Sequence, residues 1–455
     1  MRLRGWDWGL GIRDSGKRGF LGLVVLACLV FACAFGDLKD ANAQIPDNAA
    51  STESRISNPE SPPSAQSPIP NPESPLSVSL LTIGPGEIFF ERFGHNAIVV
   101  RDADSGEAVA YNYGIFDFEE GDFLANFARG RMRYRIAADE LGDDLAMYRA
   151  EGREIVEQRL NMSAEQALAL AQYLEWNARP ENAFYRYDYF IANCSTRVRD
   201  ALDHALGGVL HAQSEGRSRG YSYRLDALRL MAPEPALMLL IDLGLGPYAD
   251  QRQDFWQESF VPETLRHVVT EVNVATANGT APLADAGRVL NKGVVAEPPV
   301  LPPDLRWPFL ILGIVLGALL LGLGRRRSAA TRVPLAIFAT VFELFCGLGG
   351  LVLLFLWFGS DHVAAWRNEN LLLLSPLCLL LLPAWIASAR KRWRPRRWSR
   401  AVAWLVVLGA AFALFSKILP WFVQANLAWI VLFLPVHIAL ALILGREAGR
   451  AANTL

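Results

Sequence analysis

Apolar and polar residues alternate along most of the chain, but its C-terminal third is dominated by long apolar segments. A helix needs about 20 consecutive apolar residues to span a bilayer. Five segments beyond residue 305 are close to that length, namely Trp307 to Gly324, Val333 to Phe358, Leu371 to Ser388, Ala401 to Val423, and Leu427 to Gly445. The pattern therefore predicts an all-α domain of five transmembrane helices over residues 305–448.

The charges between these segments predict their orientation. Arg325 to Arg327 and the basic cluster from Arg390 to Arg400 alternate with loops that are nearly uncharged. Cytoplasmic loops carry an excess of arginine and lysine, so we place both clusters in the cytoplasm. The polar block from Gln44 to Arg306 then lies on the extracytoplasmic side.

The N-terminal region has the features of a targeting segment. Basic residues between Arg2 and Arg18 precede a short apolar run, Phe20 to Phe35, which is typical of a signal peptide. Cleavage after Ala43 is plausible, and an uncleaved anchor is the alternative. Residues 44–77 are rich in Pro, Ser and Asn, and we expect an extended linker there. The remaining block, residues 78–300, has the composition of a globular domain.

This globular block contains both strand and helix signals. An apolar strand, Val78 to Ile83, precedes two β-branched or aromatic runs, His95 to Val100 and Ala108 to Gly114, that are separated by turn residues. The two runs predict a hairpin that places His95 beside Asn112. Helical patterns follow at Glu140 to Glu151 and at Ser163 to Asn177, the second opened by a capping box. The predicted fold class is α+β.

Cys194 is the one cysteine outside the apolar runs, which contain Cys28, Cys33, Cys346 and Cys378. It follows Asn193, a helix-capping residue, and precedes apolar residues at helical spacing. A helix N-terminus favours the thiolate, so the sequence predicts a nucleophile at this position. The competing interpretation is that the cysteine serves only packing.

A thiol nucleophile needs a histidine as its base and a polar group that orients the imidazole. His204 lies ten residues further along the same helix, about 15 Å away by helical rise, which is too far. His211 and His267 lack strand or pocket character, so His95 is the predicted base. Asn112, across the hairpin, is the predicted orienting residue.

Several remaining features narrow the chemistry. Tyr113 and Arg197 lie next to the predicted catalytic residues and are candidate substrate contacts. Glu343, inside an apolar run, is a candidate functional residue because charge within a membrane is costly. The histidines lack metal-ligand spacing and no glycine loop for phosphate is present, so we expect no metal or cofactor. The net charge of −2 and the lack of a basic stripe give no support for nucleic-acid binding.

Three longer strings resemble a known family. They are Arg92-Phe93-Gly94-His95-Asn96-Ala97-Ile98, Tyr111-Asn112-Tyr113-Gly114, and Tyr187-Asp188-Tyr189-Phe190 with Asn193-Cys194-Ser195-Thr196-Arg197-Val198-Arg199-Asp200. Over about Leu80 to Gly208 the chain looks like the periplasmic domain of Lnb-type lipoprotein N-acyltransferases, and its membrane segments stand in the same place. It is also similar, more distantly, to circularly permuted NlpC/P60 thiol enzymes of papain-like fold, in which the histidine precedes the cysteine.

The resemblance implies a function and a location. Cys194 would be the nucleophile and His95 the base of an acyltransferase in the bacterial inner membrane, with its catalytic domain in the periplasm. The acyl donor would be a phospholipid and the acceptor a lipoprotein. Two alternatives remain, namely a peptidoglycan amidase or endopeptidase of NlpC/P60 type, and a membrane-anchored binding or sensor module in which Cys194 and His95 are structural.

Overall fold

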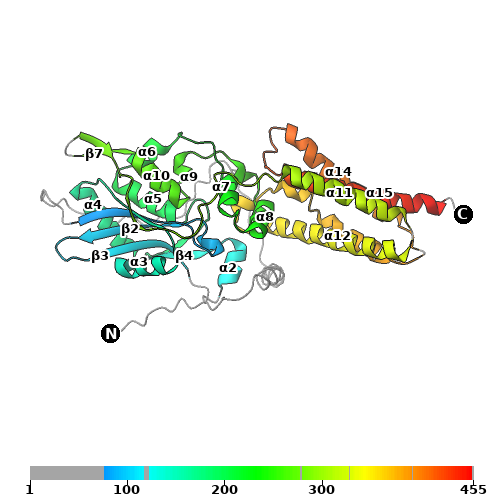
Figure 1. The fold of residues 1–455 in the computed structure, drawn as a ribbon, viewed down its shortest axis with the longest axis horizontal. Coiled ribbons are helices and arrows are strands. Elements are labelled where there is room, and N and C mark those ends of the chain that lie inside the picture. Colours follow the sequence, from blue (N-terminus) through cyan, green and yellow to red (C-terminus); the bar gives the residue numbers. More distant parts are fainter. Residues whose placement is uncertain (1–75, 117–121, 277–278, 327, 392, 453–455) are drawn as a thin grey trace.

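A seven-stranded antiparallel sheet forms the centre of the N-terminal domain in the computed structural model, which describes residues 76–116, 122–276, 279–326, 328–391 and 393–452 (Figure 1). The predicted signal segment and nearly all of the predicted linker lie outside these residues. The strands occur in the order β6-β4-β3-β2-β1-β5-β9. Their bounds are β1 Leu76–Ile83, β2 His95–Asp102, β3 Ala108–Ile115, β4 Arg133–Glu140, β5 Ile155–Arg159, β6 Phe184–Arg186 and β9 Arg288–Asn291.

The predicted hairpin is confirmed. Strands β2 and β3 pair in antiparallel register from Ala97 opposite Asn112 to Arg101 opposite Ala108. His95 lies at the start of β2, beyond the part of the strand that pairs with β3. A second, two-stranded sheet is formed by β7 Asn273–Thr276 and β8 Gly279–Pro282.

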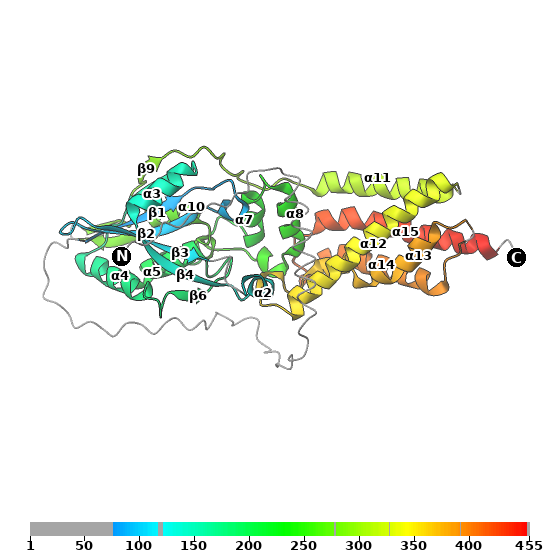
Figure 2. The same cartoon turned by 90° about the horizontal axis from the view of Figure 1, so that it is seen from below.

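Helices cover both faces of the large sheet. Alternate residues of β1 point to opposite sides, so Leu80 and Leu81 belong to different core clusters. Leu80 packs with residues of α4, α5 and α10, whereas Leu81 packs with residues of α3. Figure 2 shows α3 on one side of the sheet and α4 and α5 on the other.

Two helices of this domain follow the strands at positions that the sequence predicts. Helices α3 and α4 match the two helices predicted there, and Ser163 and Gln166 form the predicted capping box of α4. The domain's helices are η1 Phe89–Glu91, α2 Phe123–Arg129, α3 Leu141–Ala150, α4 Ala164–Asn177, α5 Cys194–Ala205, α6 Val209–Ser214, α7 Tyr223–Leu230, α8 Pro235–Gly244, η2 Pro247–Asp250, α9 Phe255–Glu258 and α10 Pro262–Glu271.

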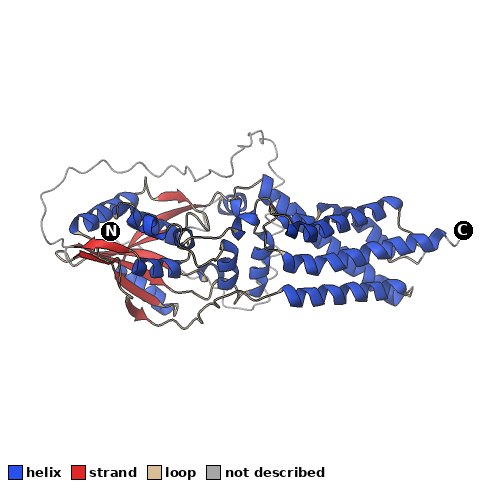
Figure 3. Cartoon of the chain, turned by 90° about the horizontal axis from the view of Figure 1, so that it is seen from above, coloured by secondary structure: helices blue, strands red, loops and turns tan. Residues whose placement is uncertain are grey.

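The C-terminal region is a bundle of apolar helices, seen in blue at the right of Figure 3. Within the described residues, four helices are long and apolar enough to cross a membrane, and one bent pair of shorter helices makes up to five spans. The segments of the bundle are α11 Arg306–Arg325, α12 Ala329–Phe358, η3 Val363–Ala365, η4 Glu369–Leu372, η5 Pro376–Leu381, α13 Leu382–Ser388, α14 Arg397–Phe415, η6 Ser416–Ile418 and α15 Leu427–Ala452.

The third predicted span is a broken segment and not one continuous helix. Residues Val363–Leu372 and Pro376–Ser388 meet at an angle of 45°. The break precedes Pro376, which lacks a backbone N–H and disfavours helical backbone in the residue before it. Ser375 caps the second half by accepting a hydrogen bond from the Leu377 amide.

Helix α8 joins the sheet domain to the bundle. Leu243 packs into an apolar cluster of the bundle, and the Trp429 indole donates a hydrogen bond of 2.7 Å to Asp242. The Gly246 amide donates to the Ala364 carbonyl at 2.7 Å, and a Cβ at Gly246 would lie 2.2 Å from the Trp366 carbonyl oxygen. Only glycine permits this approach, so the two domains are in direct backbone contact.

The basic loops lie at the far end of the bundle. The connections from α11 to α12 and from α13 to α14 are at the end distant from the sheet domain in Figure 2. The opposite end carries Asp361, which forms ion pairs with Arg131 at 2.9 Å and Arg186 at 3.0 Å. The basic loops and the sheet domain are thus at opposite ends of the bundle, which agrees with a sheet domain outside the cytoplasm.

Candidate active site

Cys194 is the first residue of α5, as its sequence context predicts. Asn193 caps the helix, because its side-chain oxygen accepts the Thr196 amide at 2.9 Å. The Asn193 side-chain amide donates in turn to the carbonyl oxygens of Phe260, at 2.9 Å, and Tyr189, at 3.1 Å. These hydrogen bonds fix the turn that presents the thiol.

The N-terminus of α5 lies directly against strand β3. A Cβ built on Gly114 would lie 3.4 Å from Cys194 Cβ, and the φ of Gly114 is +93°. Both the tight contact and the positive φ favour glycine. Gly114 therefore allows the nucleophile to approach the sheet closely.

A buried hydrogen-bond chain joins the same helix to strand β2. Ser195 Oγ lies 2.8 Å from Asn96 Oδ1 and 2.6 Å from the Ser259 carbonyl oxygen. The Asn96 side-chain amide donates to Thr82 Oγ1 at 2.9 Å. The residues that follow the predicted nucleophile and the predicted base are thus hydrogen-bonded to each other.

His95 and Asn112 are hydrogen-bonded across the hairpin, with 2.9 Å between His95 Nε2 and Asn112 Oδ1. The Asn112 amide nitrogen donates to Asp144 at 2.6 Å and lies 3.4 Å from Asp139 Oδ2. Because the amide nitrogen faces carboxylates, the Asn112 oxygen must face the imidazole, and Nε2 must carry the proton. The lone pair of His95 is then on Nδ1, the nitrogen that can accept a proton.

Burial sets the charge state of this pair. It lowers the pKa of His95 from 6.5 to about 4, against the hydrogen bond that His95 donates to Asn112, which raises the pKa. Burial also raises the pKa of the Cys194 thiol, although the backbone N–H groups of Asn96 and Ser195 lower it. The backbone N–H groups thus favour the thiolate in the direction predicted, but burial outweighs their effect on the pKa of Cys194. The site holds a neutral thiol and a neutral imidazole.

Two further charged residues that sequence reasoning missed act on the site. Arg153 is buried, donates to the Gly84 carbonyl at 3.0 Å, and lowers the pKa of both His95 and Cys194. Asp144 has its pKa raised by burial from 3.8 to about 6. Neither residue belongs to the sequence strings on which the family resemblance rests, and the fold alone brings them to the site.

Tyr113 and Arg197, the predicted substrate contacts, have partners within the protein. The buried Tyr113 hydroxyl donates to Asn177 Oδ1 at 2.7 Å, and the Arg197 guanidinium lies 4.6 Å from the centre of the Tyr185 ring. Their contact with a substrate stays a prediction. The other three histidines of the domain have different neighbours: Tyr173 for His204, Trp256 for His211 and Glu271 for His267.

A row of aromatic side chains leads from the site to the membrane bundle. Tyr187 lies within electrostatic reach of Cys194, and its ring centre is 5.9 Å from that of Tyr189. The Tyr189 ring stacks on that of His362, with 6.0 Å between the ring centres. His362 lies shortly after the end of α12. We call Tyr187, Tyr189 and His362 the aromatic track.

Exposed apolar side chains flank this track. His362 also contacts Phe127 of α2, with 6.3 Å between ring centres, and its Nε2 lies 2.8 Å from the Phe127 carbonyl oxygen. Large apolar residues here and on η1 are at least one-third exposed, and they are Ile88, Phe89, Phe90, Leu124, Phe127, Tyr189 and Ile191. An apolar surface of this kind suits contact with lipid.

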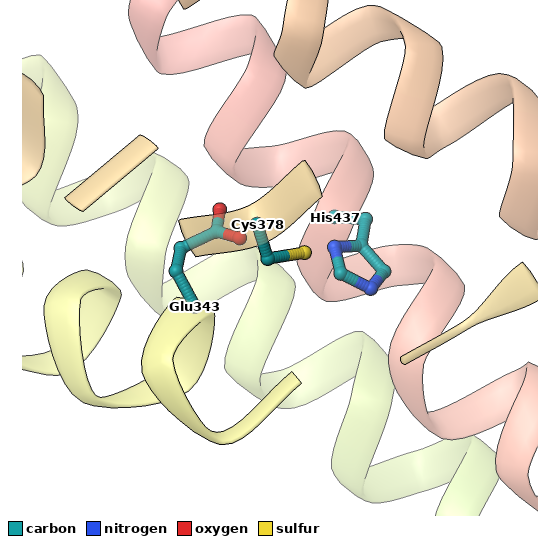
Figure 4. Close-up of side chains that lie close together, drawn as sticks. All are labelled: Glu343, Cys378 and His437. Atoms are coloured by element: carbon teal, nitrogen blue, oxygen red, sulfur yellow. The ribbon is translucent and has the colours of Figure 1, made fainter. Parts of the chain in front are cut away.

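A second polar cluster lies inside the bundle. Glu343, Cys378 and His437 are all buried, and their possible ligand atoms lie within 4.8 Å of one another (Figure 4). The spacing of possible ligands along the sequence does not predict a metal site here, because these three residues come from three separate segments. Among the described residues, this is where a metal ion could be held.

Comparison with known families gives two matches. Residues 71–233 match the family model of the Lnb N-terminal periplasmic domain, and residues 302–448 match that of the Lnb transmembrane domain. Together the two matches cover most of the chain. No curated protein and no solved structure matches significantly, so the predicted likeness to permuted NlpC/P60 enzymes stays a prediction.

Proposed function

We propose that this chain, which belongs to the Lnb family, is a lipoprotein N-acyltransferase of the bacterial inner membrane. One observation carries the proposal. A half-buried Cys194 site, with His95 hydrogen-bonded to Asn112, is connected by the aromatic track to the end of a membrane bundle. An enzyme of soluble substrates would need no such connection, whereas one that takes acyl chains from lipid would.

The first half-reaction forms an acyl-enzyme. Cys194 Sγ attacks the ester carbonyl carbon of a phospholipid while His95 Nδ1 accepts the thiol proton. The carbonyl oxygen of the ester becomes an oxyanion near the backbone N–H groups of Asn96 and Ser195 and the charge of Arg153. The carbon–oxygen bond to glycerol then breaks, and His95 returns its proton to the leaving oxygen. The products are a thioester on Cys194 and a lysophospholipid.

The second half-reaction transfers the acyl group. The α-amine of a diacylglyceryl-modified N-terminal cysteine attacks the thioester carbonyl, and His95 accepts the amine proton. Collapse of the tetrahedral intermediate forms an amide and expels the sulfur, which takes the proton back. The lipoprotein leaves with an acylated N-terminus, and the enzyme returns to its neutral thiol.

A neutral resting pair supports this order of events. His95 with a pKa of about 4 is unprotonated at neutral pH and can act as a general base as soon as the carbonyl carbon is in place. The half-buried position of Cys194 also limits access of water to the thioester. Limited access of water favours transfer over hydrolysis.

A reconstituted assay tests the proposal. Full-length protein in phospholipid vesicles is given a diacylglyceryl lipopeptide with a free α-amine, and products are measured by mass spectrometry. We expect N-acylated lipopeptide and lysophospholipid in equal amounts. Cleavage of peptidoglycan fragments without acyl transfer would support the NlpC/P60-type alternative and would refute the proposal.

A further inference from the structure

The polar cluster of the bundle joins three segments that are distant in sequence. Glu343 comes from α12, Cys378 from η5 of the broken span, and His437 from α15. Figure 4 shows Cys378 between the other two, with its sulfur directed toward a ring nitrogen of His437. Their possible ligand atoms lie within 4.8 Å of one another.

Cys346 is the fourth member of the cluster. It lies three residues after Glu343 on α12, so both side chains are on the same face of the helix. Its thiol is within hydrogen-bonding reach of both Cys378 and His437, and it is fully buried. One carboxylate, two thiols and one imidazole therefore converge inside an apolar bundle.

The Glu343 carboxylate lacks a cation among the described residues. The side chain is 1% exposed, and its Oε2 has no hydrogen-bond partner there. A buried carboxylate is costly in an apolar environment unless it is paired or coordinates a metal. The unpartnered oxygen is therefore a reason to expect a positive ion at this place.

The orientation of His437 also suits a ligand. Its Nε2 lies 3.1 Å from the Leu373 carbonyl oxygen, which can only accept a hydrogen bond. Nε2 must then carry the proton, and Nδ1 is left with a free lone pair. Histidines that bind metals usually donate their other N–H to a carbonyl or carboxylate in this way.

We propose that Glu343, Cys346, Cys378 and His437 bind a divalent transition-metal ion, for which Zn²⁺ is the best fit. Zinc binds four nitrogen, sulfur and oxygen donors in tetrahedral geometry at about 2.0–2.3 Å. Ligand atoms in such a site are separated by about 3.3–3.8 Å, so those of Glu343, Cys378 and His437, which lie within 4.8 Å of one another, need only a small contraction.

The proposed ion has a structural role. It would tie α12 and α15 to the broken span, where helix hydrogen bonding is interrupted at Pro376. The site lies in the bundle and shares no residue with the Cys194 site. The inference therefore goes beyond the proposed acyl transfer and does not depend on it.

Elemental analysis tests the inference. Cells are grown with zinc, and full-length protein is purified from them in detergent with buffers that contain no chelator. We expect about one zinc per chain, the stoichiometry of a closed tetrahedral site. Cys378→Ala and Glu343→Gln should lose the zinc, and Cys194→Ala, which removes a cysteine outside the bundle, should retain it.

Cobalt substitution keeps the test informative if those variants fail to fold. Wild-type protein is stripped with a chelator and given Co²⁺ alone, and we expect a thiolate-to-cobalt charge-transfer absorption that Zn²⁺ abolishes. Wild-type protein that contains no zinc and binds neither ion would overturn the inference. A disulfide between Cys346 and Cys378 in freshly isolated protein would also overturn it.

Discussion

Ser195 Oγ lies 2.8 Å from Asn96 Oδ1, and this buried contact links the residue after the predicted nucleophile to the residue after the predicted base. Helix α5 and strand β2 are far apart in sequence, so the distance between Cys194 and His95 depends on such contacts. The Asn96 amide is held in turn by Thr82. We therefore infer that the contact positions the two predicted catalytic residues.

The first prediction concerns Ser195→Ala. The single Ser195 hydroxyl proton is shared between the Asn96 side-chain oxygen and the Ser259 carbonyl oxygen. The change removes this buried donor, which costs about 1–3 kcal/mol of stability. We also expect a slower rate of thioester formation per folded molecule, because α5 is less firmly held against β2. Ser214→Ala is the matched control, since Ser214 is also a buried serine but its hydroxyl donates to the Leu210 carbonyl within α6. Equal turnover in both variants would remove the positioning role.

The second prediction concerns pH. Asp144, with a pKa near 6, is protonated below that pH, and its hold on Asn112 weakens when the carboxylate is neutral. His95 stays an unprotonated base down to about pH 4. The rate of thioester formation should therefore fall in two steps as the pH is lowered, partially near 6 and fully near 4.

Asp144→Asn separates these two steps. It removes the carboxylate that titrates near 6 and leaves His95 in place, so only the lower step should remain. Single-turnover rates in vesicles between pH 4 and 8 provide the measurement. A single complete loss of rate near 6.5, the ordinary pKa of histidine, would mean that His95 is not buried in the way described.

Much of the site follows from local sequence signals, and the rest depends on the fold. The cap at Asn193 and the turn between β2 and β3 are encoded by adjacent residues, so the helix start and the His95–Asn112 pair were predictable. Asp144 and Arg153 reach the site from α3 and the loop after it, and no local pattern indicates this. The helix end lowers the pKa of the Cys194 thiol as predicted, but the larger, opposite effect of burial depends on the fold and has no local sequence signal.

The bundle, too, is predictable from local sequence signals only in part. Apolar length predicts the spans, but the break before Pro376 depends on whether neighbouring segments satisfy the freed backbone groups. Spacing rules for metal ligands apply within one segment. They could not find a cluster assembled from α12, η5 and α15.

The third prediction concerns the aromatic track. Tyr189→Ala removes the ring between Tyr187 and His362, and an aromatic contact is worth about 0.5–1.5 kcal/mol. We expect thioester formation from long-chain phospholipid to slow by about 2- to 10-fold. A short-chain water-soluble ester should react at the wild-type rate. Tyr173→Ala, at a tyrosine of α4 outside the track, is the control, and equal loss with both esters would refute the role of the track.

The fourth prediction concerns topology. A reporter fused after Arg306 should be active only outside the cytoplasm, and one fused after Arg326 only inside, because α11 separates these positions. Reporters that distinguish the two compartments by enzymatic activity provide the measurement. The reverse pattern at either position would overturn the assigned orientation of the bundle.

The fifth prediction concerns Cys194 itself and tests the central claim most directly. Wild-type protein in vesicles of acyl-labelled phospholipid is quenched with acid, digested and analysed by mass spectrometry, before and after addition of the lipopeptide amine. We expect an acyl thioester on the Cys194 peptide that disappears when the amine is added, and no acyl transfer by Cys194→Ala or Cys194→Ser at normal abundance. Label on another residue, or full transfer by either variant, would contradict the assignment of Cys194 as the nucleophile.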